Sequence, residues 1–382
     1  MEKDAARAAP APGERSLPRA AGSDQFLRFI DVRKSYDQKT LVVKGFDLDV
    51  AKGEFITLLG PSGSGKTTVL MLLAGFESVT GGDIVIDGVS VARAAPYRRN
   101  IGMVFQNYAL FPHMTVADNL AYPLTVRRMD RAQIARRVEE YLALVELGGY
   151  GERYPAQLSG GQRQRVALAR ALIFEPSLVL MDEPLGALDR KLREQMQFEI
   201  TRLHKQFGFT IIYVTHDQTE ALTMSDRVAV FNEGVVQQCA PPNVLYERPD
   251  NAFVAGFIGE NNLLPGTVAA AEGEDVRVAL GGGHEVTARR GDAGAPGSAC
   301  TLSVRPEKVH IATDGRPAEN GVTATFVMRH YVGDFIRYYF RLPDGSGIVA
   351  KMLNHAAAPQ FSDDETAHLH WRAADCRAFA VK

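Results

Sequence analysis

The stretch GPSGSGKTT at residues 60–68 restricts the fold more than any other part of the chain, because it matches the pattern GxxxxGK[ST] in full. It follows a short apolar run, Phe55–Leu59, and leads into KTTVLMLLAGF, which is typical of a helix. In this context backbone N–H groups cradle a phosphate, Lys66 neutralises phosphate oxygens and Thr67 offers its hydroxyl to Mg²⁺. A chance Gly/Ser loop is the alternative, and the flanking strand and helix argue against it. The stretch therefore predicts a nucleotide site in an α/β domain.

The organisation from about residue 26 to residue 260 is typical of an α/β domain. Short apolar runs that suit buried strands, Leu178–Met181 and Ile211–Thr215 among them, alternate with helical patterns and end in polar residues. Before the glycine-rich stretch, alternating apolar and polar side chains predict a smaller antiparallel sheet. Downstream of it, DRAQIARRVEEYLALVEL is the strongest amphipathic run. We therefore expect a helical subdomain inserted at about 107–165.

Two acidic residues and a histidine stand at the ends of predicted strands. In SLVLMDEP, Asp182 is expected near Mg²⁺ and Glu183 beside the terminal phosphate, where a carboxylate polarises an attacking water. His216 ends the run TIIYVTH and could donate a hydrogen bond to charge that develops on that phosphate. Acids that cap an apolar strand are more often a solvated edge, and a lone histidine is usually structural. These roles therefore depend on the phosphate cradle upstream.

A second glycine-rich helix start lies far along the chain from the first cradle. LSGGQRQR at 158–165 opens a helix rich in arginine and glutamine. A helix N-terminus attracts anions through its free N–H groups and its dipole. A single ATP molecule does not need two glycine-rich anion sites, so the role of the second site is an open question at this point.

Five motifs in this order resemble the nucleotide-binding subunit of ATP-binding cassette (ABC) transporters over residues 26–257. They are GPSGSGKTT, Gln106 in GMVFQNYALFP, LSGGQRQR, LMDEPLGALD and VTHD. The resemblance implies a P-loop NTPase core that hydrolyses ATP as a head-to-tail pair with a second copy of the chain. It also implies that the two anion sites of one chain serve two different ATP molecules. The residues that would close on the ATP of the other chain are Ser159, Gly160, Gly161 and Gln162.

The resemblance also assigns roles to single residues. Tyr36 matches the aromatic that stacks on adenine, with a packed strand-end tyrosine as the alternative. Gln106 matches the glutamine that reaches Mg²⁺ and the attacking water, and Asp189 in GALD matches a residue that touches the partner chain. Glu183 becomes the general base and His216 the switch at the γ-phosphate. The full set expected around ATP is Tyr36, Gly60, Pro61, Ser62, Gly63, Ser64, Gly65, Lys66, Thr67, Thr68, Gln106, Ser159, Gly160, Gly161, Gln162, Asp182 and Asp189, and around Mg²⁺ it is Thr67, Gln106 and Asp182.

The pattern after about residue 258 changes to glycine-bearing turns between short β-type runs such as VRVAL and CTLSV. It predicts a small β-barrel or sandwich at 258–382, after a nucleotide-binding domain at 25–257. FIGENNLLPGTV, SVRPEKVHI, YVGD and WRAADCRAF resemble the TOBE domain, an OB-like module of importer ATPases. With RNIGMVFQNYALFPHMTVADNLAYPL, the chain is most similar to the ATP-binding subunit of polyamine (spermidine/putrescine) importers. Importers of iron, sugars or phosphonates are the alternative.

The resemblance to an importer implies partners and a place in the cell. These are transmembrane permease subunits, an extracytoplasmic solute-binding protein met only indirectly, and the cytoplasmic face of the membrane. NYALFPHMTV, which follows Gln106, would contribute Tyr108, Leu110, Phe111 and Met114 to a groove for a permease helix. The alternative is that these side chains fill the core of the helical subdomain, Phe111 above all.

Composition argues against several other classes. Formal charge is near balance, with 43 basic and 45 acidic side chains, and residues 260–382 carry 13 basic against 15 acidic ones. The basic surface that nucleic acid requires is not expected, which disfavours a soluble ABC ATPase with a nucleic-acid or regulatory role. A C-terminal domain that binds a regulator stays open. Three widely spaced cysteines suit a reducing cytosol, no run is long enough to span a bilayer, and residues 1–24 are expected to be a disordered tail.

Overall fold

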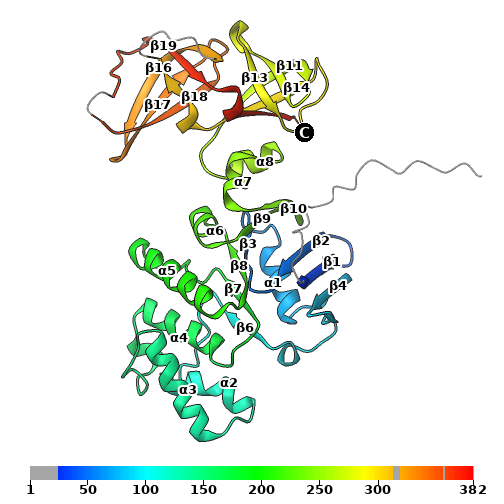
Figure 1. Ribbon diagram of the computed structural model, residues 1–382, viewed down its shortest axis with the longest axis vertical. Coiled ribbons are helices and arrows are strands. Elements are labelled where there is room, and N and C mark those ends of the chain that lie inside the picture. The colour runs from blue at the N-terminus through cyan, green and yellow to red at the C-terminus, as the bar shows by residue number, and fades with distance from the viewer. Residues whose placement is uncertain (1–24, 313–318, 356–357, 382) are drawn as a thin grey trace, which may run out of the picture.

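The fold is described by a computed structural model for residues 25–312, 319–355 and 358–381. The tail expected at 1–24 lies outside the described residues. An α/β part forms one end of the molecule and two all-β sheets form the other, with α7 (Pro242–Glu247) and α8 (Ala252–Phe257) between them (Figure 1). The proposed domain boundary at 257/258 coincides with the end of α8. Among the helices of the described residues, none combines the length and the apolar composition that crossing a bilayer requires.

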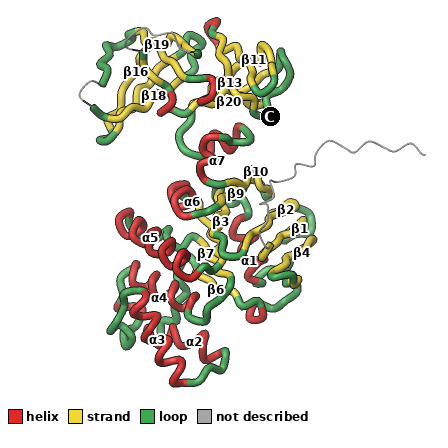
Figure 2. The backbone as a smooth tube through the Cα atoms, in the orientation of Figure 1, coloured by secondary structure: helices red, strands yellow, loops and turns green. Residues whose placement is uncertain are grey.

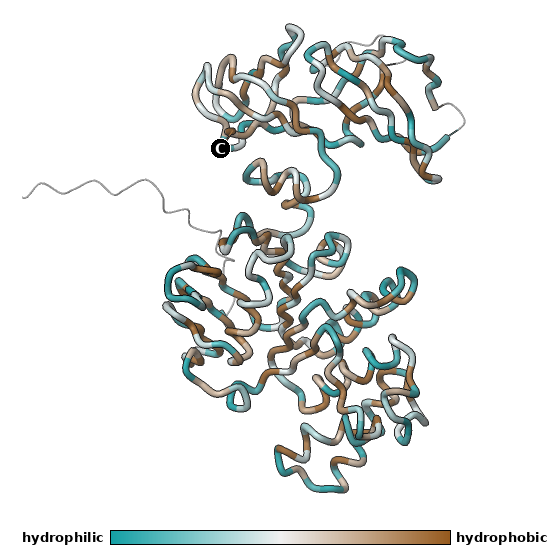
Figure 3. The backbone as a smooth tube through the Cα atoms, turned by 180° about the vertical axis from the view of Figure 1, so that it is seen from behind, coloured by the Kyte–Doolittle hydropathy of each residue, from teal (hydrophilic) through white to brown (hydrophobic). Residues whose placement is uncertain are grey.

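A six-stranded sheet with the order β10-β9-β3-β8-β7-β6 forms the centre of the α/β part. Its strands are parallel except β10, which pairs antiparallel with β9. β3 and β8 are buried along their whole length, as expected of a parallel sheet covered on both faces, and Figure 3 shows an apolar band at this position. The three strands predicted here are confirmed. The bounds are β3 (Phe55–Leu59), β6 (Ile101–Val104), β7 (Leu178–Asp182), β8 (Thr210–Thr215), β9 (Arg227–Asn232) and β10 (Val235–Ala240).

Helices follow the sheet strands at the edge where the predicted site residues lie. α1 (Lys66–Ala74) follows β3 and packs on β7 and β8. α5 (Arg190–Phe207) follows β7, and α6 (Gln218–Met224) follows β8. Asp189 and Asp217 accept hydrogen bonds from backbone N–H groups in the first turns of α5 and α6, which explains why these helices begin where they do.

Three further helices are inserted between β6 and β7, as the amphipathic pattern predicts. Each begins after a residue whose side chain caps it, Thr115, Asp130 and Ser159 respectively. Their inner faces share one apolar cluster with the central sheet. They form the end of the molecule farthest from the all-β sheets (Figures 1 and 2). The bounds are α2 (Val116–Val126), α3 (Arg131–Leu144) and α4 (Gly160–Leu172), so α4 extends past the limit expected at 165.

The two strands before β3 and the two strands after α1 form a separate antiparallel sheet with the order β2-β1-β4-β5. Phe29 and Phe46 meet on its inner face with ring centroids 4.8 Å apart. Phe46 also contacts Phe231 of β9, so the two sheets share a core with α1. The bounds are β1 (Gln25–Ser35), β2 (Leu41–Ala51), β4 (Gly81–Ile86) and β5 (Val89–Ser90).

The C-terminal region consists of two sheets where the sequence predicts one small barrel or sandwich. One is a closed barrel with the order β11-β12-β13-β20-β14, and the other is a five-stranded sheet with the order β15-β19-β16-β17-β18. Both contribute to a single apolar cluster. The bounds are β11 (Asn262–Glu272), β12 (Asp275–Leu280), β13 (Glu285–Arg290), β14 (Ala299–Val304), β15 (His310–Ile311), β16 (Asn320–Tyr331), β17 (Phe335–Arg341), β18 (Gly347–Leu353), β19 (Thr366–Trp371) and β20 (Cys376–Ala380).

The last strand of the chain returns from the second sheet to the barrel. β15 to β19 follow one another in the chain and form the second sheet, whereas β20 follows β19 and closes the barrel between β13 and β14. Two buried asparagines also join the sheets. Asn262 in β11 forms two hydrogen bonds with the backbone of Val349 in β18, and Asn320 in β16 does the same with Thr287 in β13, at 2.7–2.9 Å. The barrel closes only with the strand that follows the second sheet, and the asparagines join the two, so we expect them to fold as one unit.

Arg305, directly after β14, holds α7 and α8 against the C-terminal sheets. Its side chain is buried, and its guanidinium donates to the carbonyl oxygens of Ala255, Ile258, Glu260 and Tyr246. The guanidinium also lies 4.2 Å from the centroid of the Tyr246 ring. A planar group with five N–H donors is suited to contacts on several sides at once.

We expect Arg305→Lys to lower the free energy of unfolding by about 2–4 kcal/mol, because an ammonium group leaves several of these buried carbonyls without a donor. Urea denaturation followed by the fluorescence of Trp371, the single tryptophan and itself buried, measures the change. Arg341→Lys at an exposed position of β17 is the control and should hardly move the midpoint. Equal effects of the two substitutions would show that Arg305 is not an anchor.

Candidate functional site

The candidate site lies where parallel strands of the central sheet end side by side. Leu59, the last residue of β3, is opposite Thr215, the last residue of β8, and Asp182 at the end of β7 is opposite Val214. β6 ends beside β7 in the same way. The residues that follow these strands therefore meet at one edge, where open parallel sheets bind their ligands. Gly60, Gln106, Glu183 and His216 all follow these strand ends.

The turn between β3 and α1 has a backbone that requires glycine. Gly63 and Gly65 have φ angles of 78° and 105°. A Cβ atom on Gly60 would lie 2.0 Å from the carbonyl oxygen of Phe231, so no larger residue fits there. The turn leads directly into α1, whose first residue is Lys66. The turn and the start of the helix have the backbone form that a phosphate cradle needs, and phosphate binding by them stays a prediction.

Lys66 is buried at the centre of this turn, with 4% of its surface exposed. Its Nζ donates to the carbonyl oxygens of Gly60 and Pro61, both at 2.8 Å, and to Ser64 Oγ at 3.3 Å. Burial lowers the pKa of Lys66, and the negative charges of Glu183 and Asp182 act in the opposite direction. The ammonium group is therefore held by its own turn and interacts with the charges of both carboxylates.

Thr67 and Asp182 place a hydroxyl and a carboxylate next to each other. Thr67 Oγ1 donates to Asp182 Oδ1 at 3.2 Å. Burial raises the pKa of Asp182 and the charge of Glu183 adds to this, while the hydrogen bond from Thr67 and the charge of Lys66 lower it. Neighbouring hydroxyl and carboxylate oxygens are the hard ligands that Mg²⁺ prefers.

Glu183 stands between Gln106 and His216. Its Oε2 accepts a hydrogen bond from Gln106 Nε2 at 3.3 Å, and its Oε1 lies 3.1 Å from His216 Nδ1. The backbone N–H of Glu183 donates to Val214 O at 2.9 Å, and its φ angle is 43°, in the left-handed region. A non-glycine residue in this conformation often marks a functional position.

Hydrogen bonds and charge interactions thus connect six of the predicted residues at one sheet edge. In the described part of the chain, no hydrogen bond or ion pair joins this group to Tyr36, to Asp189 or to the turn at 159–162. The six residues are Lys66, Thr67, Gln106, Asp182, Glu183 and His216.

The second glycine-rich turn is a capped and accessible helix start. Ser159 Oγ accepts a hydrogen bond from Gln162 N at 3.3 Å, and Gln162 Oε1 accepts one from Ser159 N at 2.9 Å. A Cβ on Gly161 would lie 2.7 Å from the side chain of Leu192, so glycine here lets α4 approach α5. Ser159 itself is exposed.

Two more predicted ATP contacts are also exposed. Asp189 caps α5 by accepting a hydrogen bond from Leu192 N at 3.0 Å. Tyr36 is 59% exposed, with its ring centroid 4.8 Å from Lys34 Nζ, so the alternative of a packed strand-end tyrosine does not hold. Stacking of Tyr36 on adenine stays a prediction.

The apolar cluster after Gln106 differs from its predicted role. Tyr108 is 7% exposed and belongs to the core of the inserted helices. The prediction that its side chain lines a docking groove is therefore wrong. Leu110 packs partly buried against the same core, and Phe111 is half-buried with its ring centroid 4.9 Å from that of Tyr122. Apolar character alone does not distinguish a buried from an accessible aromatic residue.

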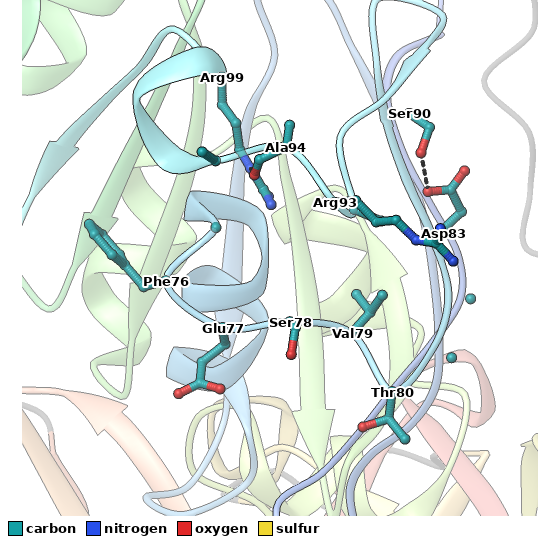
Figure 4. A pocket seen from close by; sticks show the side chains of 15 residues that line it. Phe76, Glu77, Ser78, Val79, Thr80, Asp83, Ser90, Arg93, Ala94 and Arg99 are labelled. Carbon is teal, nitrogen blue, oxygen red and sulfur yellow. Dashed lines mark hydrogen bonds between the residues drawn. The ribbon is translucent and has the colours of Figure 1, made fainter.

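A more exposed aromatic residue lies at the end of α1. Phe76 is 57% exposed, and its ring centroid lies 6.2 Å from that of Phe105, the residue before Gln106. Beside it is an open polar cavity of about 1030 Å³ between the segment after α1 and the loop before β6. Figure 4 shows its lining, to which Glu77, Arg93 and Arg99 contribute. This surface adjoins the Gln106 segment.

A charged network beside His216 was not predicted. In the first turn of α5, Arg193 Nη1 donates to Asp217 Oδ2 and Nη2 donates to Leu188 O, both at 3.1 Å. Arg193 Nε also lies 3.9 Å from Glu220 Oε1. Arg193 therefore links the loop before α5 to the loop after β8. From sequence alone, an arginine on an amphipathic helix is expected to face solvent. Asp217, which directly follows His216 in VTHDQ, could have indicated an acidic partner beside His216.

Glu220, in the first turn of α6, is a further member of this network. Its carboxylate is buried and accepts hydrogen bonds from Tyr213 Oη and Thr215 Oγ1, both at 2.8 Å. Burial raises the pKa of Glu220 and the charge of Asp217 adds to this, while the two hydrogen bonds and the charge of Arg193 lower it. The loop that carries His216 is thus fixed on both sides.

Comparison with known proteins shows the family of the chain. Residues 43–186 match the ABC transporter family, and residues 302–379 match the TOBE domain. The chain is 48% identical over 360 residues to the spermidine/putrescine import ATP-binding protein PotA of Rubrobacter xylanophilus, which covers 94% of each chain. It is 46% identical over 339 residues to the protein of the same name from Thermobifida fusca, which covers 87% of each chain.

Solved structures agree with the fold of the α/β part. A dimeric ATP-binding cassette, MJ0796, bound to ADP and Pi aligns with a TM-score of 0.51 and 32% identity, over 56% of this chain and 98% of that chain. CbiO1 of Clostridium perfringens, part of the ABC transporter complex cbiONQ, aligns with a TM-score of 0.54 and 27% identity, over 58% and 90%. The P-loop fold class expected from the five motifs is confirmed. The chain belongs to the ABC transporter family, among the import ATP-binding proteins that carry a C-terminal TOBE domain.

Proposed function

We propose that the chain is the ATP-hydrolysing subunit of an ABC importer and that it drives the uptake of polyamines such as spermidine and putrescine. The observation that carries ATP hydrolysis is the edge of the sheet where Lys66, Asp182 and Glu183 face one another. The polyamine assignment rests on relatives named as spermidine/putrescine import proteins that are similar over most of their length. No contact of this subunit with the solute is required.

The phosphates of ATP would bind on the turn 60–68, where backbone N–H groups and the Lys66 ammonium oppose their negative charge. Thr67 and Asp182 are already neighbours, and Gln106 uses its amide nitrogen toward Glu183, which leaves its amide oxygen as a ligand. These three residues would hold Mg²⁺. When bound, Mg²⁺ supplies positive charge that neutralises phosphate oxygens.

Glu183 would act as the general base that takes a proton from the attacking water. The contacts with Gln106 and His216 hold its carboxylate in one orientation. If His216 donates through Nδ1 to Glu183, its Nε2 is also a donor only when the imidazole is cationic. A protonated His216 would therefore bridge Glu183 and the γ-phosphate, and it would lose that contact when it is neutral.

A pair of chains would complete each ATP site. Ser159 is exposed, and the hydrogen bonds of its turn are separate from those of the Lys66 turn. Both turns are proposed to bind anions. The hydroxyl oxygen of Ser159 accepts within its own helix cap, so its proton is free to be donated to the γ-phosphate on a second copy of the chain. Head-to-tail pairing would bring both turns to one nucleotide, with Asp189 at the seam between the chains.

Transport would require further partners. Transmembrane permease subunits would hold the pair at the cytoplasmic face of the membrane, and an extracytoplasmic solute-binding protein would deliver the polyamine to them. The exposed Phe76 beside Phe105 supports a docking surface for a permease helix here, because movement of Gln106 would reach it directly.

Glu183→Gln should reduce steady-state ATP turnover by about 10² to 10⁴, because the amide keeps the shape of the carboxylate and lacks its basicity. Release of inorganic phosphate measures it, with Glu194→Gln on the exposed face of α5 as the control. Binding of ATP should persist. Turnover within a factor of about two of wild type would exclude Glu183 as the base.

Arg193→Met should lower kcat roughly 10- to 100-fold with little change in KM, since a misplaced His216 loop affects chemistry more than binding. Arg193→Lys should recover part of the loss. Arg190→Met, on the same helix with its side chain 94% exposed, is the control. An increase in KM at unchanged kcat would contradict a positioning role.

Ser159→Arg should abolish hydrolysis and leave the ATP affinity of the separate chain almost unchanged, because Ser159 is proposed to serve only the partner's nucleotide. A mixture with Lys66→Ala chains should recover activity, since each mixed pair has one intact site. Nucleotide-binding titrations and phosphate release test both statements. Loss of ATP binding by Ser159→Arg to the level of Lys66→Ala would place both turns in one site.

Phe76→Ser should leave the ATPase activity of the isolated subunit intact but lower its retention on membranes and abolish polyamine uptake. Phe198→Ser provides a matched control, because Phe198 is 73% exposed on α5, away from the Gln106 segment. Uptake of radiolabelled spermidine by cells beside phosphate release by the purified subunit separates the two effects. Full uptake with Phe76→Ser would exclude this residue from docking.

A further inference from the structure

A second polar cavity lies where the segment after α7 meets the barrel. Its volume is about 570 Å³, within the range of small-molecule sites. Four arginines from three parts of the chain line it together with two glutamates. They are Glu247 at the end of α7, Arg248 directly after it, Glu274 in the turn between β11 and β12, Arg289 and Arg290 at the end of β13, and Arg377 in β20.

Two of these arginines are direct neighbours in the sheet. Arg289 of β13 and Arg377 of β20 are cross-strand partners in a parallel pair. Like charges directly opposite each other destabilise a strand pair. Burial lowers the pKa of Arg377, and the positive charges of Arg248 and Arg289 act in the same direction, while Asp250 and Glu274 oppose them.

Carboxylates balance part of this cluster, since Asp250 and Glu274 both act on Arg377. Arg289 lies 3.0 Å from Asp275 and 3.7 Å from Glu274, so one arginine takes both carboxylates. Glu247 lies 3.6 Å from Lys308, a fifth cation next to the cavity. Arg377 Nε is buried and has no hydrogen-bond partner among the described residues. A bound anion beside this guanidinium would offset the cost of burying its charge.

We propose that this cavity binds a small molecule through a phosphate group, with Arg248, Arg289 and Arg377 as its ligands. Guanidinium groups match the geometry of phosphate oxygens and remain charged at physiological pH. Arg248 belongs to the segment that continues the ATPase core, whereas Arg289 and Arg377 belong to the barrel. A phosphate held between them ties the barrel to α7. The site is independent of the nucleotide site and of the transported solute.

Titration of the full-length chain with inorganic phosphate and with glycerol phosphate, at constant ionic strength, tests the proposal and separates free phosphate from a phosphate ester. A Lys66→Ala background removes binding at the nucleotide loop. Isothermal calorimetry should show saturable binding, weakened about tenfold or more by Arg377→Met and by Arg248→Met, because each removes a charge-assisted hydrogen bond.

Arg277→Met is the matched control, since Arg277 lies on β12 of the same barrel and pairs with Glu285 at the surface. Its phosphate affinity should equal that of the parent chain. Arg248 is exposed, so its substitution keeps the test valid even if Arg377→Met unfolds the barrel. No saturable heat with either ligand, or equal affinities in all variants, would overturn the proposal.

Discussion

The structure depends on parallel strands of one sheet that end in register. Leu59 is opposite Thr215 and Asp182 is opposite Val214, so the turns that follow β3, β7 and β8 open at one edge. These strands are buried and largely apolar, and the charged residues stand where the strands end or directly after them. The same rule that buries the sheet therefore collects an ammonium, two carboxylates and an imidazole at one place.

The helices convert this local arrangement into one that a second molecule can complete. Gly60 lets the phosphate turn approach Phe231, and Gly161 lets α4 approach Leu192 of α5. The close approach at Gly60 places the turn over the sheet edge. The close approach at Gly161 leaves Ser159 at an exposed helix start. Arg193 then connects the loop before α5 with the loop of His216. A series of contacts therefore leads from the loop before α5 to the carboxylate of Glu183.

Much of this arrangement was predictable from sequence, for reasons that differ between residues. The turn at 60–68 and the acids at 182–183 lie within short motifs next to apolar strands, so local pattern defines both chemistry and position. Tyr108 was misjudged because its burial depends on helices packed around it. The return of β20 to the barrel was missed because it pairs strands far apart in the chain. Arg193 carries no local signal, since its partners lie on another loop.

We propose that the two anion-binding turns of one chain serve two different nucleotides. An experimental structure of the full chain with ATP and Mg²⁺, under conditions that block hydrolysis, tests it most directly. We expect two nucleotides in a symmetric pair, each between Lys66 of one chain and Ser159 of the partner subunit. A nucleotide bound by Lys66 and Ser159 of the same chain, or a pair in which Ser159 of the partner subunit lies away from the γ-phosphate, would contradict it.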